Sequence, residues 1–83
     1  MDVQTLIHAT ALVTAAQQGS RVAWLTEDDQ VVYGTARRIK GDQVEESSLE
    51  VTTFAGMEMS FPLMELVDKY RSGYFVINPT LPE

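Results

Sequence analysis

Apolar and polar positions along the chain predict one helix followed by several strands. Between residues 3 and 18, apolar side chains recur at spacings of three and four, which is the period of an amphipathic helix. This stripe consists of Leu6, Ala9, Val13 and Ala16. Asp2 is a favourable N-cap and Gly19 a favourable left-handed stop. We therefore predict a helix over residues 3–18.

The predicted helix has no charged residue in its interior. Solvent-facing helices normally carry Glu and Lys pairs, so part of this helix is expected to be covered by another surface. Ile7 and Leu12 lie beyond the narrow stripe and are therefore candidates for contact with a second copy of the chain. The alternative is a weakly polar surface helix that needs no partner.

The next forty residues predict two hairpins. An apolar run at 22–25 and a strand over 31–39 flank a charged turn, and Gly34 within this strand indicates a bend or a close backbone approach. In the second hairpin, 48–61, a three-residue loop at 54–56 pairs Val51 with Met59 and Leu49 with Phe61, which keeps apolar residues on one face. A two-residue loop would mix the faces. Trp24 should be buried together with Val51, Met59 and Phe61.

The last third of the chain predicts a short helix and one more strand. Pro62 cannot donate to a sheet and should end the preceding strand. Residues 63–67 are typical of a single helical turn, residues 74–77 of a closing strand, and residues 78–83 of a loose tail. The pattern predicts a mainly β fold with an N-terminal α-helix and about five antiparallel strands, which form a small barrel over residues 21–77.

Composition narrows the class of protein. A chain of 83 residues is expected to form a single domain over 1–83. It has no cysteine, so disulfides and thiolate metal sites are excluded, and its formal charge of −6 disfavours generic nucleic-acid binding. The start lacks the basic region of a signal peptide, and no apolar run reaches the length of a membrane span. We expect a cytoplasmic protein that is not inserted in a membrane.

Candidate chemistry is sparse. His8 is the single histidine, and the acidic groups at 27–29 and 42–46 lack the spacing of a calcium loop. No phosphate-binding loop or nucleophile elbow is present, so we expect neither an enzyme nor a cofactor.

The one basic cluster contains Arg37, Arg38 and Lys40. On a regular strand Arg37 shares a face with Ile39, and Arg38 shares the other face with Lys40. This cluster is a candidate for a weak nucleic-acid patch. The alternative is a set of charged residues at a strand end that discourages edge-to-edge pairing.

The order of predicted elements resembles the Sm-like and SH3-like small barrels. The resemblance rests on the strand at 31–36 with its central glycine, the hairpin from Leu49 to Phe61, and the segment 61–67. The Asp-x-x-Met-Asn and Arg-Gly loops of Sm-like RNA binders are missing, and Arg71-Ser72-Gly73 departs from the second, so RNA binding does not carry over. In size, charge and layout the chain is also similar to the Rof family, which inhibits the transcription terminator Rho.

Three functions follow as hypotheses. The first is a non-catalytic protein-interaction or regulatory module that self-associates, most simply as a dimer. The second is an Sm-like RNA-binding domain. The third is a small ligand binder or hydrolase. The sequence does not identify the partner.

Overall fold

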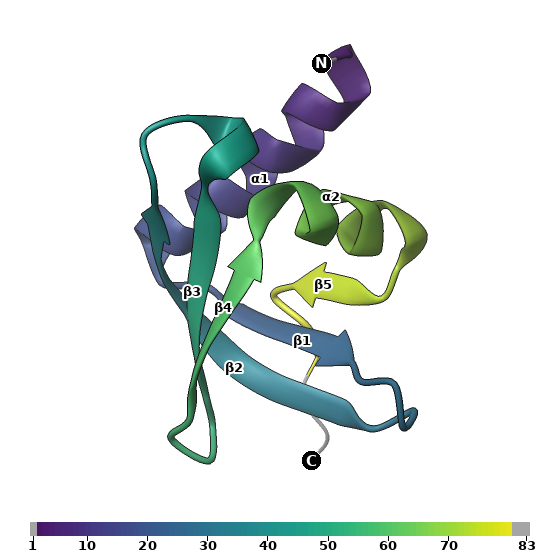
Figure 1. Cartoon of the computed structure of the whole chain (residues 1–83). Helices are drawn as coiled ribbons and strands as arrows, with labels where there is room; N and C mark the ends of the chain where they lie inside the picture. Colours follow the sequence, from purple (N-terminus) through teal and green to yellow (C-terminus); the bar gives the residue numbers. More distant parts are fainter. Residues whose placement is uncertain (1, 81–83) are drawn as a thin grey trace.

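The computed structural model describes residues 2–80 and contains two α-helices and a five-stranded antiparallel sheet (Figure 1). The helices and strands follow one another as α1 (Val3–Gln18), β1 (Arg21–Leu25), β2 (Val31–Lys40), a 3-10 turn (Val44–Glu46), β3 (Ser48–Thr53), β4 (Glu58–Pro62), α2 (Leu63–Ser72) and β5 (Phe75–Ile77). Helix and strand each account for roughly 37% of the structure, so the fold is less dominated by strands than we predicted.

Helix α1 has the predicted bounds and the predicted ends. The Asp2 carboxylate accepts a hydrogen bond from the Thr5 amide at 2.7 Å, and Gly19 ends the helix in the left-handed conformation with φ of 63°. The buried face differs from the predicted stripe, because Leu12 is fully buried whereas Leu6 is 52% exposed. The buried face of α1 consists of Ala9, Leu12, Ala15 and Ala16, so it is turned toward Leu12 and Ala15 relative to the predicted stripe. The prediction that Leu12 is available for contact with a second copy was wrong.

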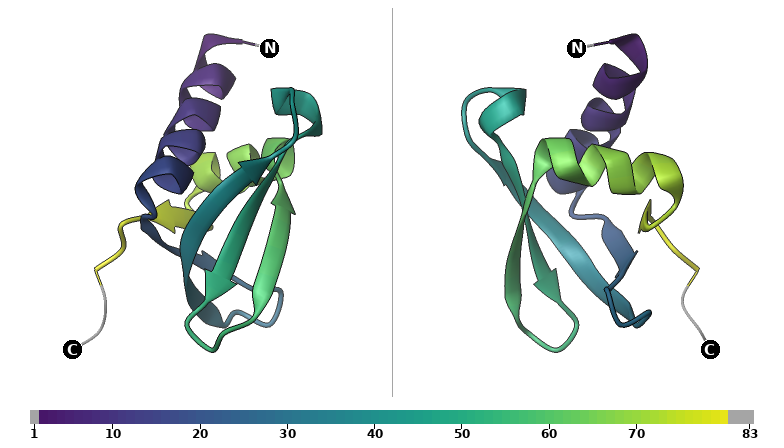
Figure 2. Two further views of the ribbon diagram at one scale, coloured as in Figure 1. Left: turned by 90° about the vertical axis from the view of Figure 1, so that its left-hand side faces the viewer. Right: turned by 45° about the vertical axis from the view of Figure 1, so that its right-hand side comes forward.

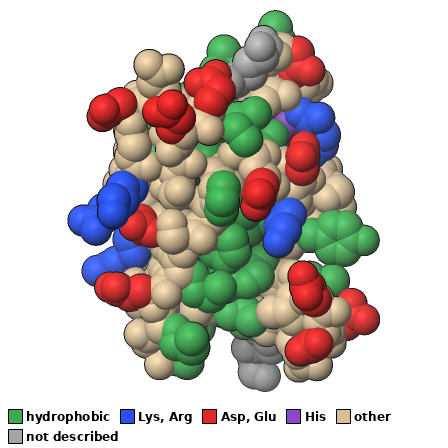
Figure 3. All heavy atoms as spheres, in the orientation of Figure 1, with side chains coloured by type: hydrophobic (Ala, Val, Ile, Leu, Met, Phe, Trp, Pro, Cys, Tyr) green, Lys and Arg blue, Asp and Glu red, His purple; other side chains and the backbone are tan. Residues whose placement is uncertain are grey.

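The sheet is strongly curved but open, with strand order β4-β3-β2-β1-β5. The expectation of a closed barrel was wrong, because β4 and β5 are both edge strands and do not pair with each other. Aromatic side chains fill the gap between them instead. Trp24 meets Phe61 edge to face with ring centroids 5.1 Å apart, and stacks on Phe75 at 6.2 Å. Figure 3 shows hydrophobic side chains gathered along this gap.

The second hairpin has the predicted register. Val51 pairs with Met59 and Leu49 pairs with Phe61, and Gly56 in the three-residue loop has a positive φ of 92°. Trp24 and Val51 are buried as expected. Met59 and Phe61 are only partly buried, because β4 is an edge strand and its inner side chains border the open gap.

Gly34 occupies the close approach predicted for it. A Cβ atom at this position would lie 2.8 Å from the Thr52 carbonyl oxygen and 2.8 Å from a methyl group of Val51. Strand β2 can therefore lie this near to β3 only with glycine at position 34.

Helix α2 is longer than the predicted single turn and extends to Ser72. It ends at Gly73, which takes the left-handed conformation with φ of 87°, and Lys69 and Arg71 lie in its last turn, as is favourable at a helix C-terminus. After β5, the backbone N–H of Asn78 donates a hydrogen bond to the backbone carbonyl of Arg21 at 2.7 Å. The remainder of the predicted tail, 81–83, lies outside the described residues.

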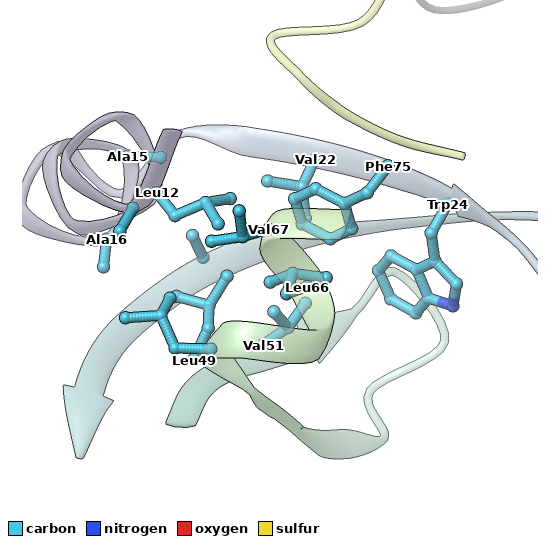
Figure 4. Close-up of a cluster of buried hydrophobic side chains, with 13 residues drawn as sticks. Leu12, Ala15, Ala16, Val22, Trp24, Leu49, Val51, Leu66, Val67 and Phe75 are labelled. Carbon is cyan, nitrogen blue, oxygen red and sulfur yellow. The ribbon is translucent and has the colours of Figure 1, made fainter. Parts of the chain in front are cut away.

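Both helices pack on the inner face of the sheet (Figure 2). Their contact with the sheet forms the core, in which Leu12 lies close to Val67 and Val22, with Leu49 and Phe75 nearby (Figure 4). Neither helix packs on the outer face of the sheet, so side chains on that face are open to contact with other molecules.

Candidate interaction surfaces

The outer side of α1 is apolar in its first two turns. Val3, Leu6 and Ile7 are 73%, 52% and 56% exposed, and they lie opposite the buried face of the helix. Thr10 and Thr14 continue this side toward the C-terminal end. We call Val3, Leu6, Ile7, Thr10 and Thr14 the α1 outer face. The prediction that Ile7 is available for contact agrees with its exposure.

A groove runs along α1 beside this face. It has a volume of about 530 Å³ and is lined by Ile7, Thr10, Ala11 and Thr14 from the helix and by Tyr70, Ile77 and Asn78 from the other side, among others. The helix residues that line the groove include the small side chains of Thr10, Ala11 and Thr14, which leave room beside the helix. The α1 outer face is therefore continuous with a concave surface rather than an isolated ridge.

Two contacts with α2 hold the first turns of α1 in place. The Arg71 guanidinium donates a hydrogen bond to the Thr5 hydroxyl at 2.9 Å, and the His8 ring meets the Tyr70 ring edge to face at 5.5 Å. The His8 Nδ1 also donates to the Gln4 carbonyl at 2.7 Å. These contacts give His8 a structural place in the fold and fix the direction of the protruding apolar turn.

Arg37 and Arg38 lie together in a hollow on the outer face of β2, β3 and β4. A β-bulge between Ala36 and Arg38 displaces Arg37 from the regular ladder, so the predicted alternation, with Arg37 on the side of Ile39, was wrong. Both arginines are exposed and line the hollow of about 500 Å³. The three-residue spacing of Ala36 and Ile39, whose side chains face inward, is the signal in the sequence that indicates a bulge.

Carboxylates balance the charge of this hollow. Glu50 pairs with Arg38 across the β2–β3 ladder, and Glu58 lines the hollow from β4. The two arginines and two glutamates sum to a formal charge of zero. Lys40 pairs with Ser48 at the end of β2 and does not line the hollow.

Polar side chains in the interior are few and uncharged. The buried polar residues among 2–80 are Ser20, Ser47 and Thr53. Within the same residues, no group of three or more His, Asp or Glu lies close enough to hold a metal ion, and no helix is long and apolar enough to cross a membrane.

One surface was missed at the level of sequence, namely the outer face of β5, β1 and β2. Val31, Tyr74 and Val76 are exposed there by 57%, 55% and 38%, and Phe54 from the β3–β4 turn, 56% exposed, stacks on Tyr33 of the same face. The signal was present in the runs 22–25, 31–33 and 74–77, which are continuously apolar. Such runs place apolar side chains on both faces of a strand.

Comparison with known proteins adds no assignment to these surfaces. Searches against protein families, curated proteins and solved structures found no match. The likeness to Sm-like barrels and to the Rof family therefore stays a prediction.

Proposed function

We propose that the chain is a non-catalytic interaction module that pairs with a second copy of itself through the α1 outer face. The observation that carries this proposal is the exposure of Val3, Leu6 and Ile7 on a helix whose residues 3–18 include no charged side chain. Covering this face therefore requires no desolvation of a charge, which is the main cost of burying polar surface.

The geometry of α1 suits close pairing. Thr10, Ala11 and Thr14 are small, and the groove beside them can receive part of a second helix. A two-fold arrangement is the commonest way to cover such a face, because each copy presents the same patch to the other.

The expected affinity is modest. Full burial of one aliphatic side chain contributes about 1.5–3 kcal/mol, so each half-exposed residue contributes roughly 1 kcal/mol and the six in a dimer roughly 6 kcal/mol. Association costs an estimated 4–15 kcal/mol in lost freedom, so these six residues offset it only at the low end of that range, and contacts of Thr10, Ala11 and Thr14 in the groove must supply the remainder. We therefore expect a weak dimer that forms only at high micromolar concentration and dissociates on dilution.

Support for a non-catalytic role comes from the interior. The buried polar side chains among the described residues are hydroxyls, and no carboxylate or histidine there is enclosed in a dry pocket that would tune it for acid–base work.

The RNA-binding alternative has less support than self-association. Nucleic-acid affinity arises largely from neutralisation of phosphates, and the hollow that contains Arg37 and Arg38 has a formal charge of zero in a chain of −6.

Light scattering behind a sizing column tests the proposal. The mass should rise toward that of two chains as concentration increases, and Ile7→Glu should restore the mass of one chain without changing the circular dichroism spectrum. Gln30→Glu is the matched control, because it adds the same charge at an exposed position in the β1–β2 turn, away from α1, and should leave the dimer intact. A wild-type mass of one chain at high micromolar concentration would end the proposal.

A further inference from the structure

The outer face of β5, β1 and β2 is an apolar surface built from two rows across the strands. In the first row Ala23 lies between Val76 and Tyr33, with which it pairs directly, and Phe54 stacks on Tyr33 at 6.0 Å. The second row contains Leu25 with its partner Val31, and Tyr74, whose carbonyl accepts from the Leu25 amide. We call these seven residues the outer sheet face.

The position of this face follows from the alternation of the strands. Val22 and Trp24 point into the core, so Ala23 between them points to the opposite side. Residues directly opposite each other in an antiparallel pair share a face, which places Tyr33 and Val76 with Ala23. No helix of the described chain packs there, since α1 and α2 both lie on the inner face (Figure 2).

The exposed patch is comparable in area with the largest apolar patches on monomeric proteins. Phe54 and Tyr74 are each a little over half exposed, so they contribute roughly 100 Å² each, because an aromatic side chain offers about 150–250 Å². With Val31 and Val76 added, the patch reaches roughly 350 Å², within the range of functional patches on monomeric proteins. An apolar sheet face is normally buried against another layer of secondary structure, and a helix is one such layer.

The charge beside the patch indicates the kind of partner. Glu27, Asp28 and Asp29 lie in the exposed turn that joins Leu25 to Val31, directly beside the second row. Figure 3 shows acidic side chains gathered over this turn, next to a hydrophobic side chain that projects from the connection between α2 and β5. Arg21 lies at the opposite end of β1. The acidic turn favours a partner with basic side chains at this border of the patch.

We propose that the outer sheet face docks an amphipathic helix of another protein, with apolar residues on one side and Lys or Arg beside them. The first row spans three inter-strand spacings, about 14 Å, which a helix of about ten residues covers at 1.5 Å per residue. A second copy of the chain is a poorer occupant, because pairing through this face would bring a second set of Glu27, Asp28 and Asp29 beside the same carboxylates, whereas the α1 outer face has no charged residue. An anionic lipid surface is disfavoured by the same carboxylates. This proposal does not rest on self-association through α1.

The test uses the full chain and a synthetic amphipathic peptide with leucines on one side and lysines on the other. Nuclear magnetic resonance titration should shift the amide signals of Ala23, Tyr33 and Val76, and added salt should weaken the binding. Phe54→Ser and Val31→Ser should each weaken it about tenfold, as truncation of a central apolar contact does. Ile7→Ser is the matched control on α1 and should not change it.

Several outcomes would overturn the proposal. These are shifts confined to α1 or to the gap between β4 and β5, equal binding of a peptide with glutamates in place of the lysines, or no binding at all. Stronger binding to phosphatidylglycerol vesicles than to the peptide would assign the face to a lipid surface instead. A dimer mass that Val31→Ser abolishes and Ile7→Glu does not would assign the face to a second copy, and would also contradict the α1 proposal. Loss of the dimer with Ile7→Glu but not with Val31→Ser supports pairing through α1 and shows that the outer sheet face is not the dimer interface.

Discussion

Replacing Leu12 by alanine tests which side of α1 belongs to the core. Leu12 is 0% exposed and lies between the helix and the side chains of Val22 and Val67 (Figure 4). The change removes three carbon groups at about 0.8 kcal/mol each, or about 2.4 kcal/mol, and a cavity that does not collapse raises the cost to as much as about 5 kcal/mol. Alanine has a slightly higher helix propensity than leucine, and this difference reduces the loss of stability by only a few tenths of a kcal/mol.

This loss is large for a chain of 83 residues. Total stability at about 0.05–0.15 kcal/mol per residue is about 4–12 kcal/mol, so Leu12→Ala removes about a fifth of it or more. Thermal unfolding should show a midpoint about 10–20 °C lower, since 1 kcal/mol shifts a domain of this size by about 4–8 °C. Leu6→Ala is the matched control, because Leu6 is 52% exposed and should change stability by no more than about 0.5 kcal/mol. Equal midpoints for the two variants would refute the placement of the buried face.

Two further changes test the fold in other places. Gly34→Ala should destabilise the chain by about 1–3 kcal/mol in urea unfolding, because the new Cβ would lie 2.8 Å from the Thr52 carbonyl oxygen; an unchanged midpoint would contradict the close approach of β2 and β3. The hydrogen bond from the Thr5 amide holds the pKa of Asp2 below its usual value, so the stabilisation that its carboxylate gives is present above that value and is lost as the pH falls through the lowered pKa. Asp2→Asn keeps a capping side chain that does not titrate, and its thermal midpoint should fall less than that of the wild type below about pH 4. An equal fall in thermal midpoint with pH for the two proteins would contradict a contribution of the Asp2 carboxylate to stability.

The hairpins could be predicted from the sequence because several local signals agreed. Alternation from Leu49 to Phe61 allowed one register with all apolar residues on one face, and Gly56 suited the left-handed position of the loop. The buried side of α1 could not be predicted in the same way. Alanines occur on the inner side, and larger aliphatic residues lie on both, so the period of the helix was clear but its orientation was not.

Features that depend on contacts between distant strands were not predictable. Closure of the sheet depends on whether β4 and β5 pair with each other. No local pattern in the sequence predicts that Trp24, Phe61 and Phe75 fill the gap between these strands instead. The surfaces show the same limit. The exposure of Ile7 could be inferred from the absence of charges on α1, whereas the outer sheet face requires the pairing that brings Val76 and Tyr33 to either side of Ala23.

Cysteine cross-linking along α1 tests self-association most directly, because the natural chain contains no cysteine. Single changes Val3→Cys, Ile7→Cys, Thr10→Cys and Thr14→Cys each give one thiol on the α1 outer face, and Glu27→Cys on the β1–β2 turn is the control. A disulfide forms only where two Cα atoms come within about 7 Å, which a two-fold helix pair allows at the positions nearest its axis. Mild oxidation should therefore give a covalent dimer at one or two of the four α1 positions and not at position 27. Equal cross-linking at all five positions, or none on α1, would contradict pairing through this face.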